Sequence, residues 1–89
     1  MNPRSIAGRA ARVLLLVAIF PATVHADFDA GTVAYGRGDY VTARNEWLPL
    51  AHTGDSASQF SLGVLYSEGL GVEADYTEAA RWYTLAAKQ

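Results

Sequence analysis

One pattern of five residues occurs twice in this chain, and the second copy begins 36 residues after the first. The first copy is Asp39, Tyr40, Ala43, Trp47 and Ala51, and the second is Asp75, Tyr76, Ala79, Tyr83 and Ala87. In both copies, small and aromatic residues follow one another at intervals of four, which places them on one face of an α-helix. A period in the thirties, in which each helix begins at a turn, is typical of stacked helical hairpins. The sequence therefore predicts an all-α fold.

Residues 1–26 have the features of a secretory signal peptide. Arg4, Arg9 and Arg12 form a basic start, an apolar run of 8 residues (13–20) follows, and Ala26 ends a small-residue cleavage motif. Crossing a bilayer takes about 20 apolar residues, which favours a cleaved signal over the alternative, a retained membrane anchor. We expect cleavage after Ala26 and a periplasmic or secreted product without a stable membrane anchor.

The mature product would be residues 27–89, and its composition excludes several classes of partner and site. Four basic residues oppose nine acidic ones, which gives a net charge of −5. An acidic surface argues against binding to nucleic acid or anionic lipid. The chain has no Cys, which excludes disulfides, thiolate catalysis and zinc–thiolate sites. The core must therefore be stabilised by packing alone, and we expect most of the nine aromatic side chains to contribute to it.

Start and stop signals predict four helices in the mature chain. They cover residues 27–35, 39–53 and 55–68, and a stretch that begins at 75. Asp39 and Asp75 are expected to accept hydrogen bonds from the free N–H groups of the first turns. Glu78, three residues after Asp75, completes the spacing of a capping box.

Pro49 interrupts the second predicted helix. Proline cannot donate to the carbonyl of Asn45, and its ring crowds the preceding turn. We predict a kink at Pro49 with residues 50–53 as a short continuation, in α or 3₁₀ form. The alternative is a helix that ends at Leu48.

Small residues in the second half of the chain predict close helix packing. Gly63 and Ala79 would allow the third and fourth helices to approach, with aromatic rings filling the remaining space. Gly69 suits the left-handed conformation that ends a helix. Gly71 would let the loop turn again, and Val72 would tuck beneath the hairpin.

A longer motif connects these small and aromatic residues. It reads Leu62-Gly63-x-Leu65-Tyr66-x-x-Gly69-x-Gly71-Val72-x-x-Asp75-x-x-x-Ala79-x-x-Trp82-Tyr83-x-x-Ala86-Ala87. This motif resembles the Sel-1-like repeat, which belongs to the tetratricopeptide-like α/α solenoids. The resemblance covers residues 55–89, and residues 27–54 resemble a degenerate neighbouring unit without the Gly-x-Gly-Val loop. It implies an α/α superhelix of two helical hairpins and a role in holding proteins together. With residues 1–26 as a signal peptide, the expected fold is a signal-peptide helix followed by these two hairpins.

The polar residues of the mature chain show no catalytic arrangement. His52 is its only histidine, and a lone histidine near a helix end interacts more often with terminal carbonyls than with a substrate. Asp75 and Glu78 could form a carboxylate pair for glycoside chemistry, but their cap positions already account for them. The sequence therefore predicts a non-enzyme with no catalytic residue, cofactor or metal.

The main functional prediction is an exported protein–protein interaction or scaffold module. The candidate partner-binding residues are four tyrosines near helix ends, where a ring is buried while its hydroxyl stays in water: Tyr35, Tyr40, Tyr66 and Tyr76. The partner would be a protein or peptide, and self-association through the C-terminal repeat edge is also expected, because repeat arrays need covered ends. The alternatives are a cell-envelope enzyme, or enzyme accessory, that acts on peptidoglycan or a polysaccharide, and a truncated member of a longer array.

Overall fold

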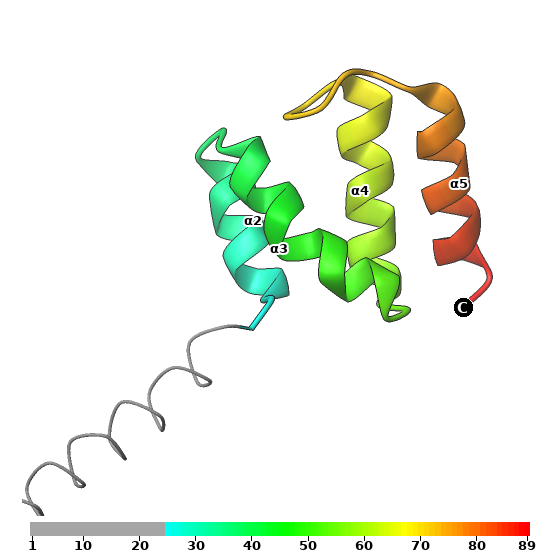
Figure 1. Ribbon diagram of the computed structural model, residues 1–89, viewed down its shortest axis with the longest axis horizontal. Coiled ribbons are helices and arrows are strands. Elements are labelled where there is room, and N and C mark those ends of the chain that lie inside the picture. The colour runs from blue at the N-terminus through cyan, green and yellow to red at the C-terminus, as the bar shows by residue number, and fades with distance from the viewer. Residues whose placement is uncertain (1–24) are drawn as a thin grey trace, which may run out of the picture.

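The computed structural model describes residues 25–89, which form four α-helices (Figure 1). The helices are α2 (Phe28–Gly36), α3 (Tyr40–His52), α4 (Ser56–Glu68) and α5 (Tyr76–Ala87). Helices α2 and α3 form one hairpin, α4 and α5 form a second, and α3 packs against α4 to join them. The predicted all-α fold of two helical hairpins is confirmed. The predicted signal peptide lies outside the described residues, apart from its last two.

An aspartate side chain caps the N-terminus of each of these helices. Asp39 Oδ1 accepts a hydrogen bond from the N–H of Thr42 at 3.2 Å, and Asp75 Oδ1 accepts one from the N–H of Glu78 at 3.0 Å. The other two caps are Asp27 and Asp55. Each carboxylate satisfies a backbone donor that has no partner inside its helix.

Two of these aspartates also close the helix that precedes them. Gly38 has φ of 78°, and this left-handed turn lets the N–H of Asp39 reach the carbonyl of Ala34 at 2.9 Å. Asp55 repeats the arrangement with the carbonyl of Leu50 at 3.1 Å. One residue therefore ends one helix and starts the next, which fixes the path of the chain between them.

The loop between α4 and α5 keeps the same closure although it is longer. The N–H of Asp75 donates to the carbonyl of Tyr66 at 2.9 Å, and residues 69–74 form a loop that reaches from the end of α4 toward the first hairpin before it returns to α5 (Figure 1). This bond occupies the N–H that a capping box would use. Glu78 instead pairs with Arg81 one turn later, at 2.5 Å, so the prediction of a capping box is wrong in its second half.

Helix α3 continues through Pro49 to His52, so the alternative that it ends at Leu48 is wrong. The residues after Pro49 are α-helical, and tight i+3 bonding is confined to the cap, where Thr53 N–H lies 3.1 Å from the carbonyl of Leu50. Burial explains the continuation, because Ala51 is 2% exposed against α4. This packing offsets the hydrogen bond that proline removes.

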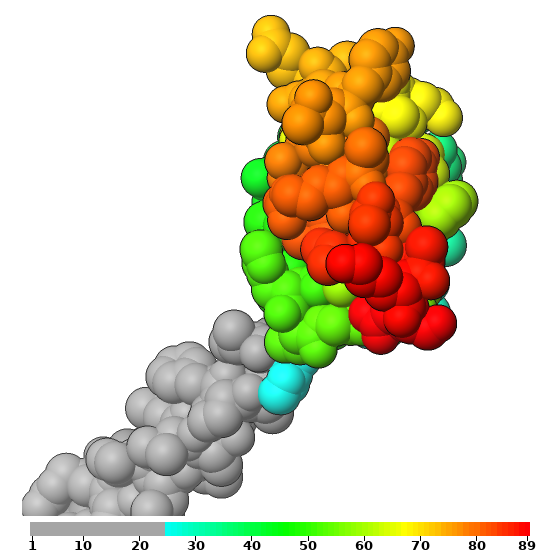
Figure 2. All heavy atoms as spheres, turned by 90° about the vertical axis from the view of Figure 1, so that its right-hand side faces the viewer, coloured from blue at the N-terminus to red at the C-terminus, as the bar shows by residue number. Residues whose placement is uncertain are grey.

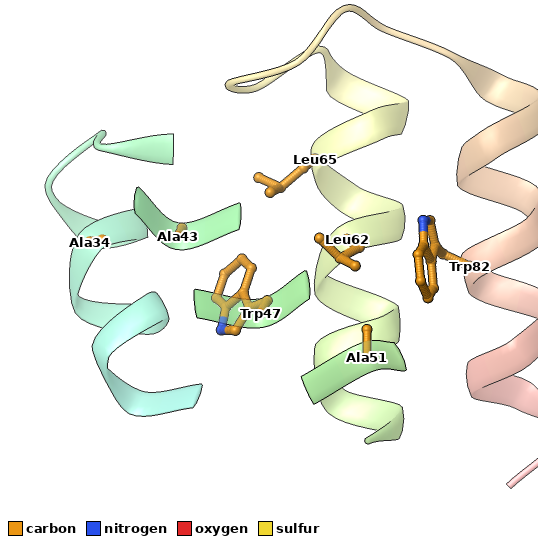
Figure 3. Packing of buried hydrophobic residues seen from close by; sticks show 7 residues of the cluster. All are labelled: Ala34, Ala43, Trp47, Ala51, Leu62, Leu65 and Trp82. Atoms are coloured by element: carbon orange, nitrogen blue, oxygen red, sulfur yellow. The ribbon is translucent and has the colours of Figure 1, made fainter. Parts of the chain in front are cut away.

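The core lies between the hairpins and along the seam inside each of them (Figure 3). Its buried cluster consists of Ala34, Ala43, Trp47, Ala51, Leu62, Leu65 and Trp82. Inside each hairpin a glycine of the first helix faces an aromatic ring of the second. A Cβ added to Gly31 would collide with the indole of Trp47, and one added to Gly63 would lie 2.5 Å from Tyr83 Cε1. The predicted close approach of the helices at Gly63 is confirmed.

The loop between α4 and α5 also packs against the first hairpin. Gly69 has φ of 69°, the left-handed conformation predicted for it, and Gly71, where the loop was expected to turn again, has φ of 70°. A Cβ on Gly71 would lie 2.9 Å from the backbone carbon of Tyr40, so the loop lies against the first turn of α3. Val72, as expected, packs against the core from this loop.

Candidate partner-binding surface

A shallow hollow of about 210 Å³ lies on the face shared by α2 and α4. Its lining residues are Thr32, Tyr35, Trp47, Phe60, Ser61 and Val64. We call it the α2/α4 groove. The exposed surface inside it is mainly carbon, so it suits apolar side chains.

Trp47 forms the floor of the α2/α4 groove, and its indole is fixed by its neighbours. The indole N–H donates to the carbonyl of Phe28 at 3.1 Å, and the rings of Phe28 and Tyr35 lie 5.8 and 6.0 Å from it. Gly31 leaves the space into which the indole fits. A ring fixed by a hydrogen bond and by neighbouring rings loses little conformational entropy when a ligand contacts it.

The far side of the α2/α4 groove is formed by α4. Phe60 is 56% exposed, with its ring 5.3 Å from that of Tyr83. Val64 lies one turn further along the same helix. An exposed phenyl ring beside a valine provides the apolar contacts that a partner's side chain would cover.

A second hollow, of about 700 Å³, lies at the outer edge formed by α4 and α5. Its lining residues are Ser56, Ala57, Phe60, Tyr83, Ala86 and Ala87. We call it the C-terminal hollow. It is open and mainly apolar, and Phe60 separates it from the α2/α4 groove.

The four tyrosines predicted as partner-binding residues lie in different environments. Tyr35 and Tyr40 contact each other edge to face at 5.3 Å, and of these two Tyr35 lines the α2/α4 groove. Tyr66 packs against the core, whereas Tyr76 is 76% exposed at the start of α5. The structure thus brings Tyr35 and Tyr40 together, and the binding role of all four stays a prediction.

The lining of the groove includes residues that sequence reasoning assigned to the core. Phe60 is one of the nine aromatic residues, most of which were expected to contribute to the core. Among the aromatic residues, Trp47 and Trp82 are fully buried, at 4% and 2% exposure, whereas Phe60 is exposed. The spacing of Phe60 and Val64 by one helical turn is the signal that could have identified them as one surface.

The ion pair of Glu78 and Arg81 lies on α5, and neither residue lines either hollow. A hydrogen bond from the Arg81 guanidinium holds the pKa of Glu78 below its usual value, and the same bond raises the pKa of Arg81. His52 contacts Trp82 edge to face at 5.5 Å.

Within residues 25–89, no three side chains of His, Cys, Asp or Glu are placed to hold a metal ion. None of the helices in this part of the chain is long and apolar enough to cross a membrane.

Comparison with known proteins identifies the second hairpin. Residues 56–89 match the family model of the Sel1 repeat. No curated protein and no solved structure matches the chain. The matched residues begin with α4 and end just after α5, and they include the Gly69–Gly71 loop that packs on Tyr40. The chain therefore carries a Sel1 repeat, formed by the hairpin of α4 and α5.

Proposed function

We propose that this protein is exported and acts as a protein–protein interaction module that holds a peptide segment of its partner in the α2/α4 groove. The Sel1 repeat supports the general role, because such repeats are protein-interaction modules. The observation that carries the specific proposal is the α2/α4 groove itself, an apolar hollow between two rigid helices with Trp47 as its floor.

The size of the groove favours a peptide over a small-molecule ligand. Sites that enclose a drug-sized ligand or cofactor measure about 300–1,000 Å³. The α2/α4 groove, at about 210 Å³, is smaller and open. It fits one or two apolar side chains of a longer segment whose remainder lies along the surface.

The secondary structure determines how such a segment would bind. The backbone N–H and carbonyl groups of α2 and α4 are used inside the helices, so they offer no strand edge to a partner. Affinity would therefore come from side-chain contacts with Tyr35, Phe60 and Val64. Because the mature chain carries a net charge of −5, a neutral or basic partner segment would meet the least repulsion.

Site-specific crosslinking tests the binding proposal. A photoreactive residue at Ser61, which lines the groove, should crosslink a partner in envelope extracts, while the same residue at Thr84, on the exposed side of α5, should not. The purified partner should then bind the protein directly, and Val64→Arg should weaken binding about tenfold or more. Val41→Arg is the matched control, because Val41 is 56% exposed and does not line the groove. Equal loss of affinity in both variants would reject the groove as the site.

The proposed export has a separate test. N-terminal sequencing of protein recovered from the periplasm or medium should begin at Asp27. Recovery of the chain with residues 1–26 intact in a membrane fraction would instead support the retained anchor. Turnover of muropeptides by the purified protein would support the envelope-enzyme alternative.

A further inference from the structure

The same contacts occur inside each of the two hairpins, and they show which positions of the hairpins are equivalent. The pair Gly31 and Trp47 in the first hairpin corresponds to Gly63 and Tyr83 in the second. The neighbouring ring pairs correspond as well, because Phe28 contacts Trp47 and Phe60 contacts Tyr83. First helices are thus related by a shift of 32 residues, and second helices by a shift of 36.

This equivalence shows what α4 covers on the first hairpin. Leu62 and Leu65 of α4 are fully buried, and Figure 3 shows Leu65 extending toward α3. The buried Gln59 donates to the carbonyl of Ala51 at 3.0 Å. Trp47 and Ala51 are 4% and 2% exposed. The α3–α4 contact therefore buries apolar residues from both helices.

Helix α2 carries the counterpart of the α4 face, and this counterpart is exposed. Ala30 and Val33 stand at the positions equivalent to Leu62 and Leu65. Ala30 is exposed, and Val33 is 53% exposed. Among the described residues, no helix covers this face as α3 covers the face of α4.

Helix α5 carries the counterpart of the α3 face, which is open too. Tyr83 and Ala87 are equivalent to Trp47 and Ala51, and both line the C-terminal hollow. Tyr83 is half-buried and Ala87 is exposed. Figure 2 views the molecule from the α5 side, where this surface lies. The two exposed faces are thus the two halves of an interface that the chain already forms internally.

We propose that the protein associates head to tail with a second copy of itself, with α2 of one copy in the C-terminal hollow of the next. Helix α2 would occupy on α4 and α5 the place that α4 occupies on α2 and α3. The contact would bury Ala30 and Val33 against Tyr83 and Ala87. Because its two surfaces differ, such an interface is heterologous and repeats from copy to copy until the chain of copies closes into a ring or is capped.

The side chains at this contact indicate weaker binding than inside the chain. Ala30 and Val33 would bury less apolar surface than the two leucines of α4. Asp27 stands at the position of Gln59, so the hydrogen bond from the Gln59 side-chain amide to the Ala51 carbonyl has no counterpart. Opposite charges partly compensate, because Lys88 follows Ala87 and would lie beside the incoming Asp27. The association is therefore reversible and weakens with salt.

Head-to-tail stacking would also lengthen the α2/α4 groove. A second copy's α2 would continue the row of α2 and α4, and the side chain of Phe60 would then lie between two grooves. The association does not depend on the proposed peptide binding, and each can fail without the other.

Sedimentation velocity of four proteins tests the stacking. The unmodified protein, purified after expression of the full chain, should gain mass beyond a dimer between about 10 μM and 1 mM. Val33→Glu blocks one half of the interface and Ala87→Glu the other, and each should raise the apparent dissociation constant about tenfold or more. Val41→Glu is the matched control. Val41 is about as exposed as Val33. Its equivalent in α5, Thr77, stays exposed although the first hairpin packs against the second, so a stacked copy should not cover Val41 either.

A mixture of the two edge variants gives the decisive result. Val33→Glu keeps an intact C-terminal hollow and Ala87→Glu an intact α2 face, so an equimolar mixture should form a complex of two chains and no larger species. That result also shows that both variants are folded. Head-to-tail stacking would be overturned if the unmodified protein were monomeric at 1 mM. It would also be overturned if Ala87→Glu lost self-association while Val33→Glu kept it, because that result would indicate a dimer formed by two C-terminal edges.

Discussion

Gly63 in α4 lies directly against the ring of Tyr83 in α5, where an added Cβ would be 2.5 Å from Cε1. No side-chain carbon fits at that distance, so the hydrogen of glycine sets how closely the two helices approach. The first hairpin repeats the relationship with Gly31 and Trp47. Both hairpins therefore depend on a missing side chain in one helix and a ring in the other.

Enlarging Gly63 should separate the helices of the second hairpin. We expect Gly63→Leu to lower the free energy of unfolding by about 1–3 kcal/mol, because the ring of Tyr83 must move into less favourable packing. Thermal and urea unfolding measure this loss. Gly36→Ala is the control: it meets nothing within 4 Å and lies in a helix, so it should be neutral or stabilising. An unchanged melting temperature in Gly63→Leu would contradict the packing described for this hairpin.

The contact between Gly71 and Tyr40 predicts a difference between two similar substitutions. Gly71 and Gly38 both have positive φ, so alanine at either position costs about 1 kcal/mol of backbone strain. At Gly71 the new Cβ would also lie 2.9 Å from Tyr40 backbone, whereas at Gly38 it meets nothing within 4 Å. Unfolding experiments should therefore show a larger loss for Gly71→Ala. Equal losses would mean that the loop does not pack against α3.

The cap at the start of α4 should be worth more than the one at the start of α5. Asp55 accepts from both the N–H and the hydroxyl of Ser58, at 2.9 and 2.5 Å, and Ser58 is completely buried. Asp55→Ala removes a cap and leaves a buried hydroxyl unpaired, at a cost of about 2 kcal/mol. Asp75→Ala should cost about 1 kcal/mol. Unfolding of both variants in urea checks this order, and Asp55→Asn, which keeps an acceptor, should recover much of the loss.

The Glu78–Arg81 pair predicts a small pH-dependent contribution. The hydrogen bond from Arg81 lowers the pKa of Glu78 from its usual 4.5, so the ionised carboxylate is favoured in the folded state. This stability is fully present above pH 4.5 and is lost as the pH falls through the lowered pKa. Because the pair is solvent-exposed, Glu78→Gln should cost only about 0.3 kcal/mol near pH 7. A stability difference that grows on acidification, measured by urea unfolding from pH 7 to 3, would show that the pair is not the cause.

The local features of this fold could be predicted because each depends on a few neighbouring residues. Asp39 and Asp75 were predicted to begin helices, since a carboxylate at that position satisfies free N–H groups. Gly69 was predicted to end one, because glycine adopts positive φ without strain. The repeated pattern and the Sel1 motif indicated helical hairpins. Gly63 indicated that the two helices of the second hairpin approach closely.

Other features depended on which groups meet across the hairpins. Pro49 stays within α3 because Ala51 beyond it is buried against α4. Glu78 pairs with Arg81 because the carbonyl of Tyr66 already takes the N–H of Asp75. Phe60 lies between two hollows because the hairpins leave one side of α4 uncovered.

The sequence by itself therefore determined where the helices begin and end and which residues could lie at their contacts, since capping, turn geometry and periodicity act over a few residues. Only the tertiary structure decided which apolar side chains are covered. Val33 and Leu65 stand at equivalent positions, yet one is exposed and the other buried. Among the described residues, α3 packs against the face of α4 that carries Leu65 and no helix packs against Val33, and no local pattern in the chain encodes that difference.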